Sequence, residues 1–245
     1  MGRGFPVAVL LGCAISIAIL LSGCNGSRAP SPTPTESLAL TATEIVYMCA
    51  EKMETVDSVH FKLTQVGGTT PIGIGLDVSE AAGDIVRPDK VKGEITAIMI
   101  GLPVKVEYIT VGNITLIANP MTGEWEPFPG VFSAAGIFDP DIGIAGILRS
   151  MTNLSRLEDG KAAGFACFHI RGNVTSDDLR PITRLFTPSY LEGIDMAAEI
   201  WLDREDFLLR QIRLEGQITV NEKPGIIRTI TISDYNKSVE IELPT

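Results

Sequence analysis

The spacing of apolar and polar residues divides this chain into three parts. Residues 7–21 form an apolar run broken only by small residues, and residues 25–35 are rich in Ser, Thr and Pro without apolar periodicity. The rest begins with apolar residues at helical spacing and continues mostly with the two-residue alternation that is typical of β-strands. The sequence therefore predicts an apolar leader, a polar linker and one folded domain.

Three helices are predicted among many strands. Residues 43–56 carry apolar side chains at helical spacing. Asp139 before Pro140 is typical of a helix start and predicts a helix at 142–151, and the opening Ser176-Asp177-Asp178 predicts another at 176–186. Strands are expected at residues 59–64, 73–77, 92–100, 104–111, 114–119, 153–157, 164–174, 195–203, 208–220, 226–235 and 238–243. Long β-runs with few helices favour an α+β fold with a curved, mostly antiparallel sheet.

The apolar run closes with Leu21-Ser22-Gly23-Cys24, which is similar to the lipobox of bacterial lipoproteins. The run is too short for an ordinary membrane-spanning helix, so it fits the apolar core of a secretory signal. The likeness implies a signal peptide over 1–23, a lipidated Cys24 with a tether over 24–37, and a domain over 38–245. An ordinary secretory signal followed by a chance cysteine is the alternative. Acyl chains on Cys24 would anchor an extracytoplasmic domain to the cell membrane.

The charge of the chain limits its partners. Loss of Arg3 with the signal would change the formal net charge from −10 to −11. Such an acidic domain offers no basic surface to nucleic acid and no attraction to anionic headgroups. Nucleic acid is therefore excluded as a partner, and membrane attachment is expected through the lipid on Cys24.

Two cysteines remain in the predicted domain, Cys49 and Cys167, because Cys13 is lost with the signal and Cys24 is modified. Outside the cytoplasm they could form a disulfide. Alternatively, each is a small buried apolar side chain, since Cys49 lies in a helical apolar pattern and Cys167 in a strand. The sequence leaves both possibilities open, because a bridge needs Cα atoms about 4.4 to 6.8 Å apart and the sequence alone does not give the distance between these two residues.

No pattern in the sequence indicates covalent catalysis, metal binding or nucleotide binding. His60 and His169 lie inside predicted strands, with no serine elbow nearby and no zinc, redox or Walker-type motif in the chain. Asp203-Arg204-Glu205-Asp206 imitates a paired-carboxylate site, but it lies where a hairpin must turn. We therefore expect no enzyme activity, no cofactor and no metal; a hydrolase would lack its nucleophile and base.

The predicted strand over residues 95–100, Ile-Thr-Ala-Ile-Met-Ile, is apolar on both faces. Such a strand needs an apolar neighbour on each side. A second layer of protein would provide one. So would a cavity between the sheet and its helices that holds lipid acyl chains, whose burial stabilises by about 0.8 kcal/mol per methylene.

Several segments together resemble the LppX/LprG family, the actinobacterial cell-envelope lipoproteins grouped as LppX, LprA, LprF and LprG. The likeness covers nearly the whole mature domain, and its order and spacing agree with the lipobox and the tether. The segments that carry it are FDPDIGIAGIL (138–148), IWLD (200–203), LRQIRL (209–214), ISDYNKSV (232–239), DSVHF (57–61) and GEW (123–125).

The resemblance implies a strongly curved antiparallel β half-barrel, with helices covering its concave face and an internal hydrophobic cavity, an architecture shared by fold with the carriers LolA and LolB. It implies a ligand with acyl chains, an envelope lipid or glycolipid, and allows an envelope transporter as a partner. The cavity-facing pattern of the family falls on Ile95, Ala97, Met99, Val104, Val106, Tyr108, Leu116, Ile144 and Leu148.

The leading hypothesis is thus a membrane-anchored lipoprotein that binds and carries lipid without covalent chemistry. The alternative is a structural or interaction lipoprotein, with a core filled by side chains, that recruits an envelope partner.

Overall fold

A computed structural model describes residues 39–244 apart from 73–74, 129–133 and 184–189. The chain divides into two units, Met1–Leu38 and Ala39–Thr245. The signal peptide, Cys24 and the tether lie outside the described residues and stay predictions. The second unit is the folded domain described below.

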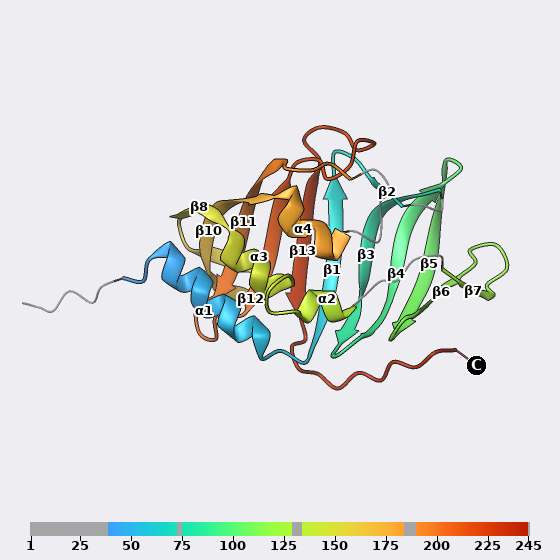
Figure 1. Ribbon diagram of the computed structural model, residues 1–245, viewed down its shortest axis with the longest axis horizontal. Coiled ribbons are helices and arrows are strands. Elements are labelled where there is room, and N and C mark those ends of the chain that lie inside the picture. Colours follow the sequence, from blue (N-terminus) through green and yellow to red (C-terminus); the bar gives the residue numbers. More distant parts are fainter. Residues whose placement is uncertain (1–38, 73–74, 129–133, 184–189, 245) are drawn as a thin grey trace, which may run out of the picture. The chain divides into compact units, whose positions relative to one another are not determined.

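In the described part of the chain, thirteen strands pair into one antiparallel sheet (Figure 1). The strands are β1 (Ser58–Val66), β2 (Thr70–Ile72), β3 (Leu76–Val86), β4 (Lys90–Met99), β5 (Leu102–Val111), β6 (Ile114–Ala118), β7 (Trp125–Pro127), β8 (Thr152–Arg156), β9 (Gly160–Ala162), β10 (Phe165–Thr175), β11 (Asp195–Asp203), β12 (Leu209–Glu215) and β13 (Ile227–Ser233). Their order is β7-β6-β5-β4-β3-β1-β13-β12-β11-β10-β8, with β2 beside β3 and β9 beside β10. Because β1 lies between β3 and β13, it joins the two halves of the sheet.

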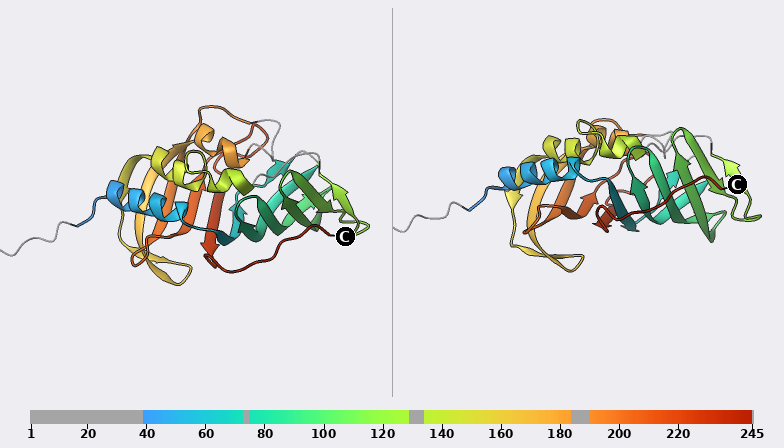
Figure 2. Two further views of the ribbon diagram at one scale, coloured as in Figure 1. Left: turned by 60° about the horizontal axis from the view of Figure 1, so that its bottom comes forward. Right: turned by 90° about the horizontal axis from the view of Figure 1, so that it is seen from below.

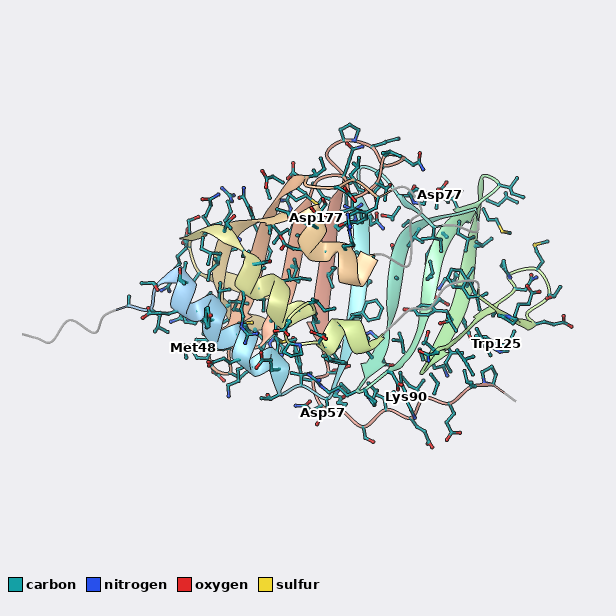
Figure 3. All side chains as sticks on the ribbon, in the orientation of Figure 1. Met48, Asp57, Asp77, Lys90, Trp125 and Asp177 are labelled. Atoms are coloured by element: carbon teal, nitrogen blue, oxygen red, sulfur yellow. The ribbon has the colours of Figure 1, made fainter. Side chains whose placement is uncertain are left out.

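The helices lie on one face of the curved sheet (Figure 2). They are α1 (Ala42–Glu54), α2 (Ala134–Phe138), α3 (Ile144–Ser150) and α4 (Ser176–Thr183). Labelled charged side chains such as Asp57 and Lys90 lie at the ends of the elements and not between helices and sheet (Figure 3). No helix in the described part of the chain is long and apolar enough to cross a membrane.

Helix α1 is fixed by its own sequence. The Thr41 side chain accepts a hydrogen bond from the Glu44 backbone N–H, and the Glu44 carboxylate accepts one from the Thr41 backbone N–H, which forms a capping box. The apolar stripe of the helix packs into the core, and its buried members are Ile45, Val46, Cys49, Ala50 and Met53. This stripe is the one that the helical spacing predicts.

Cys49 and Cys167 are both free thiols and both buried, so the structure contains no bridge between them. Burial raises the pKa of each thiol, which keeps it protonated and unreactive at neutral pH. The disulfide that the sequence left open is absent from this structure.

Strand β3 differs most from expectation, because the sequence predicted only a short strand at 73–77. Its pairing with β4 shifts register between Val78 and Glu80. Leu76 and Val78 are buried before this irregularity and Ile85 after it, so inward positions change from even to odd. A bulge therefore hides the two-residue period along this strand.

Two other expectations are wrong. Residues 238–243 form no strand, although Ile241 is buried. Asp139 does not cap a helix at Pro140; its carboxylate accepts hydrogen bonds from the backbone N–H groups of Asp141 and Ile142 and so closes a turn between α2 and α3. The expected helix therefore starts at Ile144.

Candidate functional site

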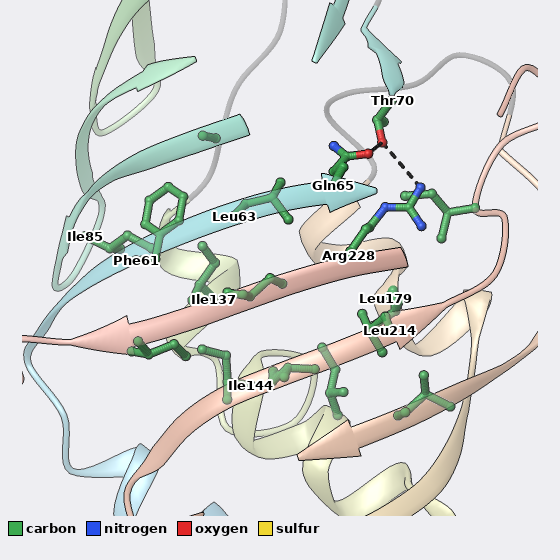
Figure 4. Close-up of a pocket in the computed structure, with 18 of the residues that line it drawn as sticks. Phe61, Leu63, Gln65, Thr70, Ile85, Ile137, Ile144, Leu179, Leu214 and Arg228 are labelled. Carbon is green, nitrogen blue, oxygen red and sulfur yellow. Dashed lines mark hydrogen bonds between the residues drawn. The ribbon is translucent and has the colours of Figure 1, made fainter. Parts of the chain in front are cut away.

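A cavity of about 230 Å³ lies between the sheet and the helices α2 to α4. Its wall is almost entirely apolar, with side chains from the middle strands of the sheet on one side and from the helices on the other (Figure 4). An apolar cavity of about 150 Å³ in another protein stays dry and binds benzene. A space of this kind is therefore suited to an apolar guest.

The alternation of β1 and β13 builds the centre of the cavity wall. Val59, Phe61 and Leu63 on β1 face the cavity, as do Ile230 and Ile232 on β13. The two strands are neighbours, with Phe61 opposite Ile232 and Leu63 opposite Ile230. Inward residues of adjacent strands thus form one continuous apolar surface.

Four of the residues that the family pattern indicated line the cavity: Ile95, Tyr108, Ile144 and Leu148. Tyr108 lies opposite Gly93 across the β4–β5 pair. A Cβ at Gly93 would approach the Tyr108 hydroxyl oxygen to 2.8 Å and the Ala82 carbonyl oxygen to 2.4 Å. The absence of a side chain at Gly93 therefore lets the tyrosine ring lie across the strand.

Four others belong to the apolar core rather than to the cavity wall. Ala97 and Val106 are buried, and Met99 and Val104 are half-buried against the same cluster. Ala97 lies opposite Val104, further along the β4–β5 pair than Ile95. The sequence thus predicted which face of β4 and β5 points inward, but not how far the cavity extends along these strands.

Leu116 is a correction. It lies opposite Ile109, whereas Ile117 lies opposite the cavity-lining Tyr108, so Leu116 is on the other face of the sheet. A shift of one residue exchanges the two faces of a strand. Ile100 is a second correction, because it lies in the β4–β5 turn and is 94% exposed, without the covering layer that its strand pattern suggested.

One end of the cavity is polar and was missed in the sequence. Gln65, Thr70 and Arg228 line it (Figure 4). The Arg228 guanidinium forms an ion pair with the Glu222 carboxylate. The Thr70 hydroxyl lies 2.7 Å from Glu222 Oε1 and 2.9 Å from Gln65 Oε1, and it accepts a hydrogen bond from Arg228 Nη2 over 3.3 Å. The signal in the sequence is a polar residue at an inward position, Gln65 after Leu63 and Arg228 before Ile230.

The two histidines face away from the cavity. His60 alternates with the inward residues of β1, and its Nδ1 is 2.8 Å from Asp84 Oδ1 on β3. His169 Nε2 is 3.2 Å from Glu199 Oε2, and its ring stacks on Trp201. Each histidine therefore takes part in a cross-strand pair on the opposite face of the sheet.

The carboxylates also have structural partners. Burial raises the pKa of Glu199, but hydrogen bonds from Arg171 and His169 outweigh it, so that the pKa is lowered overall. Asp203 and Asp206 lie at the β11–β12 turn, as the sequence interpretation expected, and both bind the Arg210 guanidinium. Within the described residues, no group of three or more His, Cys, Asp and Glu side chains is placed to hold a metal ion.

Comparison with known proteins identifies relatives over almost the whole chain. The model of the LppX_LprAFG lipoprotein family matches residues 41–241. The lipoarabinomannan carrier protein LprG of Mycolicibacterium smegmatis is 28% identical, over 98% of this chain and 97% of the relative. LprG of Mycobacterium leprae is 26% identical, over 97% of this chain and 90% of the relative. These matches confirm the resemblance found in the sequence.

Two solved structures share the fold. LprF from Mycobacterium bovis superposes with a TM-score of 0.66 at 16% identity, covering 83% of this chain and 96% of that one. The Mycobacterium tuberculosis lipoprotein LppX superposes with a TM-score of 0.61 at 15% identity, covering 82% of this chain and 98% of that one. They confirm the predicted open, curved and mostly antiparallel sheet.

Proposed function

The chain belongs to the LppX_LprAFG lipoprotein family, and from this premise we propose that it is a carrier that binds lipid acyl chains in its cavity. The observation that carries the proposal is the apolar space enclosed by the sheet and α2 to α4. Each methylene that moves from water into such a space contributes about 0.8 kcal/mol. Binding by burial alone needs no reacting group, which agrees with a carrier family and not an enzyme family.

The ligand class that we propose is an envelope lipid or glycolipid. The relatives in Mycolicibacterium smegmatis and Mycobacterium leprae are both named lipoarabinomannan carrier proteins. We extend to this chain only the common chemistry of such cargo, acyl chains joined to a polar portion. The cavity would take the acyl chains, while a large polar portion would stay outside.

A lipid anchor on Cys24 and the linker that follows it complete the proposed mechanism. Acyl chains on Cys24 would hold the protein on the outer side of the cell membrane, because two chains suffice for stable anchoring. The proline-rich residues 25–35 would extend by roughly 30 Å at about 3.1 Å per residue. The domain would thereby exchange lipid with the membrane or with an envelope transporter while remaining tethered.

The alternative, a packed interaction lipoprotein, requires a core filled by side chains. A cavity of about 230 Å³ beneath α2 to α4 counts against it. The deciding measurement is lipid mass spectrometry on the chain from residue 24 carrying Cys24→Ser, purified under native conditions. We expect acylated lipid near one equivalent per protein. Neither bound lipid nor uptake of a fluorescent fatty acid by the folded protein would overturn the carrier proposal.

A paired substitution tests the position of the site. Ile95 lines the cavity, so Ile95→Trp should fill part of it and weaken binding of the fluorescent fatty acid at least about tenfold, or about 1.4 kcal/mol. Met99→Trp is the matched control, because Met99 lies on the same strand but outside the cavity wall. Equal binding by Ile95→Trp and the parent, with folding intact, would contradict the assignment of this cavity as the lipid site.

A further inference from the structure

The polar end of the cavity combines two residues that are far apart in sequence. Gln65 on β1 lies directly opposite Arg228 on β13. Both occupy inward positions, in line with the apolar residues Leu63 and Ile230 of the same strands. The polar end is therefore the continuation of the apolar wall and shares its interior space (Figure 4).

Among the described residues, hydrogen-bond donors exceed acceptors at this end. The Gln65 amide nitrogen is buried and has no hydrogen-bond partner among the described residues. Arg228 offers five N–H groups. The described residues give it three acceptors, Gly216 O, Thr70 Oγ1 and Glu222 Oε1. Because buried donors in proteins are nearly always satisfied, the unpaired Gln65 amide indicates an acceptor that the described residues do not provide.

The charge at this end is already balanced. The Glu222 side chain is fully buried and pairs with Arg228, whose side chain is 6% exposed. The other carboxylate oxygen of Glu222, Oε2, accepts hydrogen bonds from the backbone N–H groups of Ile218 and Thr219. Arg228 is the one charged residue among the described residues of the cavity wall. An anionic group placed here would lie beside a buried carboxylate without a cation of its own, which is costly.

We propose that the polar end binds an uncharged ester carbonyl of the acyl lipid, with Gln65 Nε2 and the remaining Arg228 N–H groups as donors. The preferred ligand class is then an O-acyl ester, which should bind more tightly than a free fatty acid or an alkyl ether. This inference rests on the proposed function, since it concerns the same cavity. It assigns to Gln65 and Arg228 the orientation of the lipid, with the ester at the polar end and the chains along the apolar wall.

The test compares three competitors of equal chain length, 1,2-dioleoylglycerol, the corresponding dioleyl ether and oleate. Each displaces a fluorescent fatty acid from the chain that begins at residue 24 and carries Cys24→Ser. We expect the diester to bind about tenfold more tightly than the diether, because an ether lacks the carbonyl acceptor. Oleate should also be weaker than the diester, because it buries one chain in place of two and because its carboxylate would lie near that of Glu222. This comparison needs no substitution in the cavity and is therefore independent of any folding defect.

Gln65→Leu then identifies the donor. This change removes the unpaired amide at nearly the same size, and we expect the diester preference to fall to about threefold or less. Gln211→Leu is the matched control: Gln211 alternates on β12 with the cavity-lining Ile212 and Leu214, so it lies on the other face. The control should keep the full preference.

The outcomes separate the two proposals. Displacement by diester and diether with equal affinity, or a preference for oleate, would overturn the ester site and leave the carrier proposal intact. A full diester preference in Gln65→Leu would overturn the assignment of Gln65. Failure of every competitor and of the probe to bind would instead overturn the carrier function itself.

Discussion

The helices cover two regions of the same sheet, and these regions are filled to different degrees. Beneath α1 the core is closed: Ile45 and Cys49 are fully buried, as are Leu202 and Leu209 on the strands below. Beneath α2 to α4 the cavity remains, and Ile144 and Ile147 on α3 are only half-buried at its wall. The same kind of side chain is therefore packed tightly in one region and borders a space in the other.

Helix length and local sequence explain the difference. Helix α1 has 13 residues with a regular apolar stripe and a capping box, whereas α2 and α3 have 5 and 7 residues. A Cβ at Gly143 would lie 2.2 Å from the Ile137 carbonyl oxygen, and one at Gly146 would lie 2.0 Å from that of Asp141. These glycines permit the tight connection between α2 and α3. Two short helices joined by a tight turn cover less of the sheet than one long helix does, and a cavity remains beneath them.

The largest expected effect is in the packed region. Ile45→Ala should lower the free energy of unfolding by about 2 to 5 kcal/mol, because Ile45 is fully buried and α1 leaves no room for relaxation. Urea denaturation followed by circular dichroism measures this. Binding of the fluorescent fatty acid by the folded protein should be unchanged. A loss below about 1 kcal/mol would show that the region beneath α1 is not closely packed.

The matched change in the cavity region should cost less. Ile147→Ala on α3 removes a half-buried side chain that already borders empty space, so we expect a loss of about 1 kcal/mol. The enlarged cavity should bind the fluorescent fatty acid at least as tightly as the parent. Equal destabilisation by Ile45→Ala and Ile147→Ala would remove the distinction between the two regions.

The smallest effect is expected at the start of α1. Thr41→Ala removes the side chain of the capping box and should cost about 0.5 to 1 kcal/mol at neutral pH. Hydrogen bonds from Thr41 lower the pKa of the Glu44 carboxyl. The ionised Glu44 carboxylate therefore contributes to the free energy of unfolding above the ordinary pKa of a glutamate. This contribution is lost as the pH falls through the lowered pKa that Glu44 has in the folded protein.

Urea denaturation at a series of pH values tests this dependence. The difference between Thr41→Ala and the parent should narrow under acid conditions. A difference that does not change with pH would show that the hydrogen bond from the Thr41 hydroxyl gains nothing from the charge of Glu44.

The elements that the sequence predicted well are those whose signals are local. Helix α1 has its stripe and its cap within 14 residues, and β1, β5 and β11 alternate over most of their length. Strand β3 was largely missed because a bulge changes the phase of its alternation. Apolar and polar residues alternate over residues 238–243, which predicts a strand, but no neighbouring strand pairs with this segment in the described structure. Alternation thus reports which side chains are buried and not whether the backbone pairs.

The candidate site shows the same division. The family pattern placed Ile95 and Tyr108 correctly on the inner face, since β4 and β5 keep their phase along their pairing. Leu116 was assigned to the wrong face, because the phase after a turn depends on the register of the hairpin. Gln65 and Arg228 went unnoticed because each is an ordinary polar residue until the other is brought beside it.

The sequence by itself determined the family, the capped helix α1 and the alternation of most strands, because neighbouring residues encode these features. Only the tertiary structure decided that a space remains beneath α2 to α4 and that Gln65 and Arg228 share its polar end. A cavity is the volume that distant elements fail to fill, and no single segment specifies it. The unpaired Gln65 donor likewise becomes evident only when all of its possible partners in the described fold have taken their places.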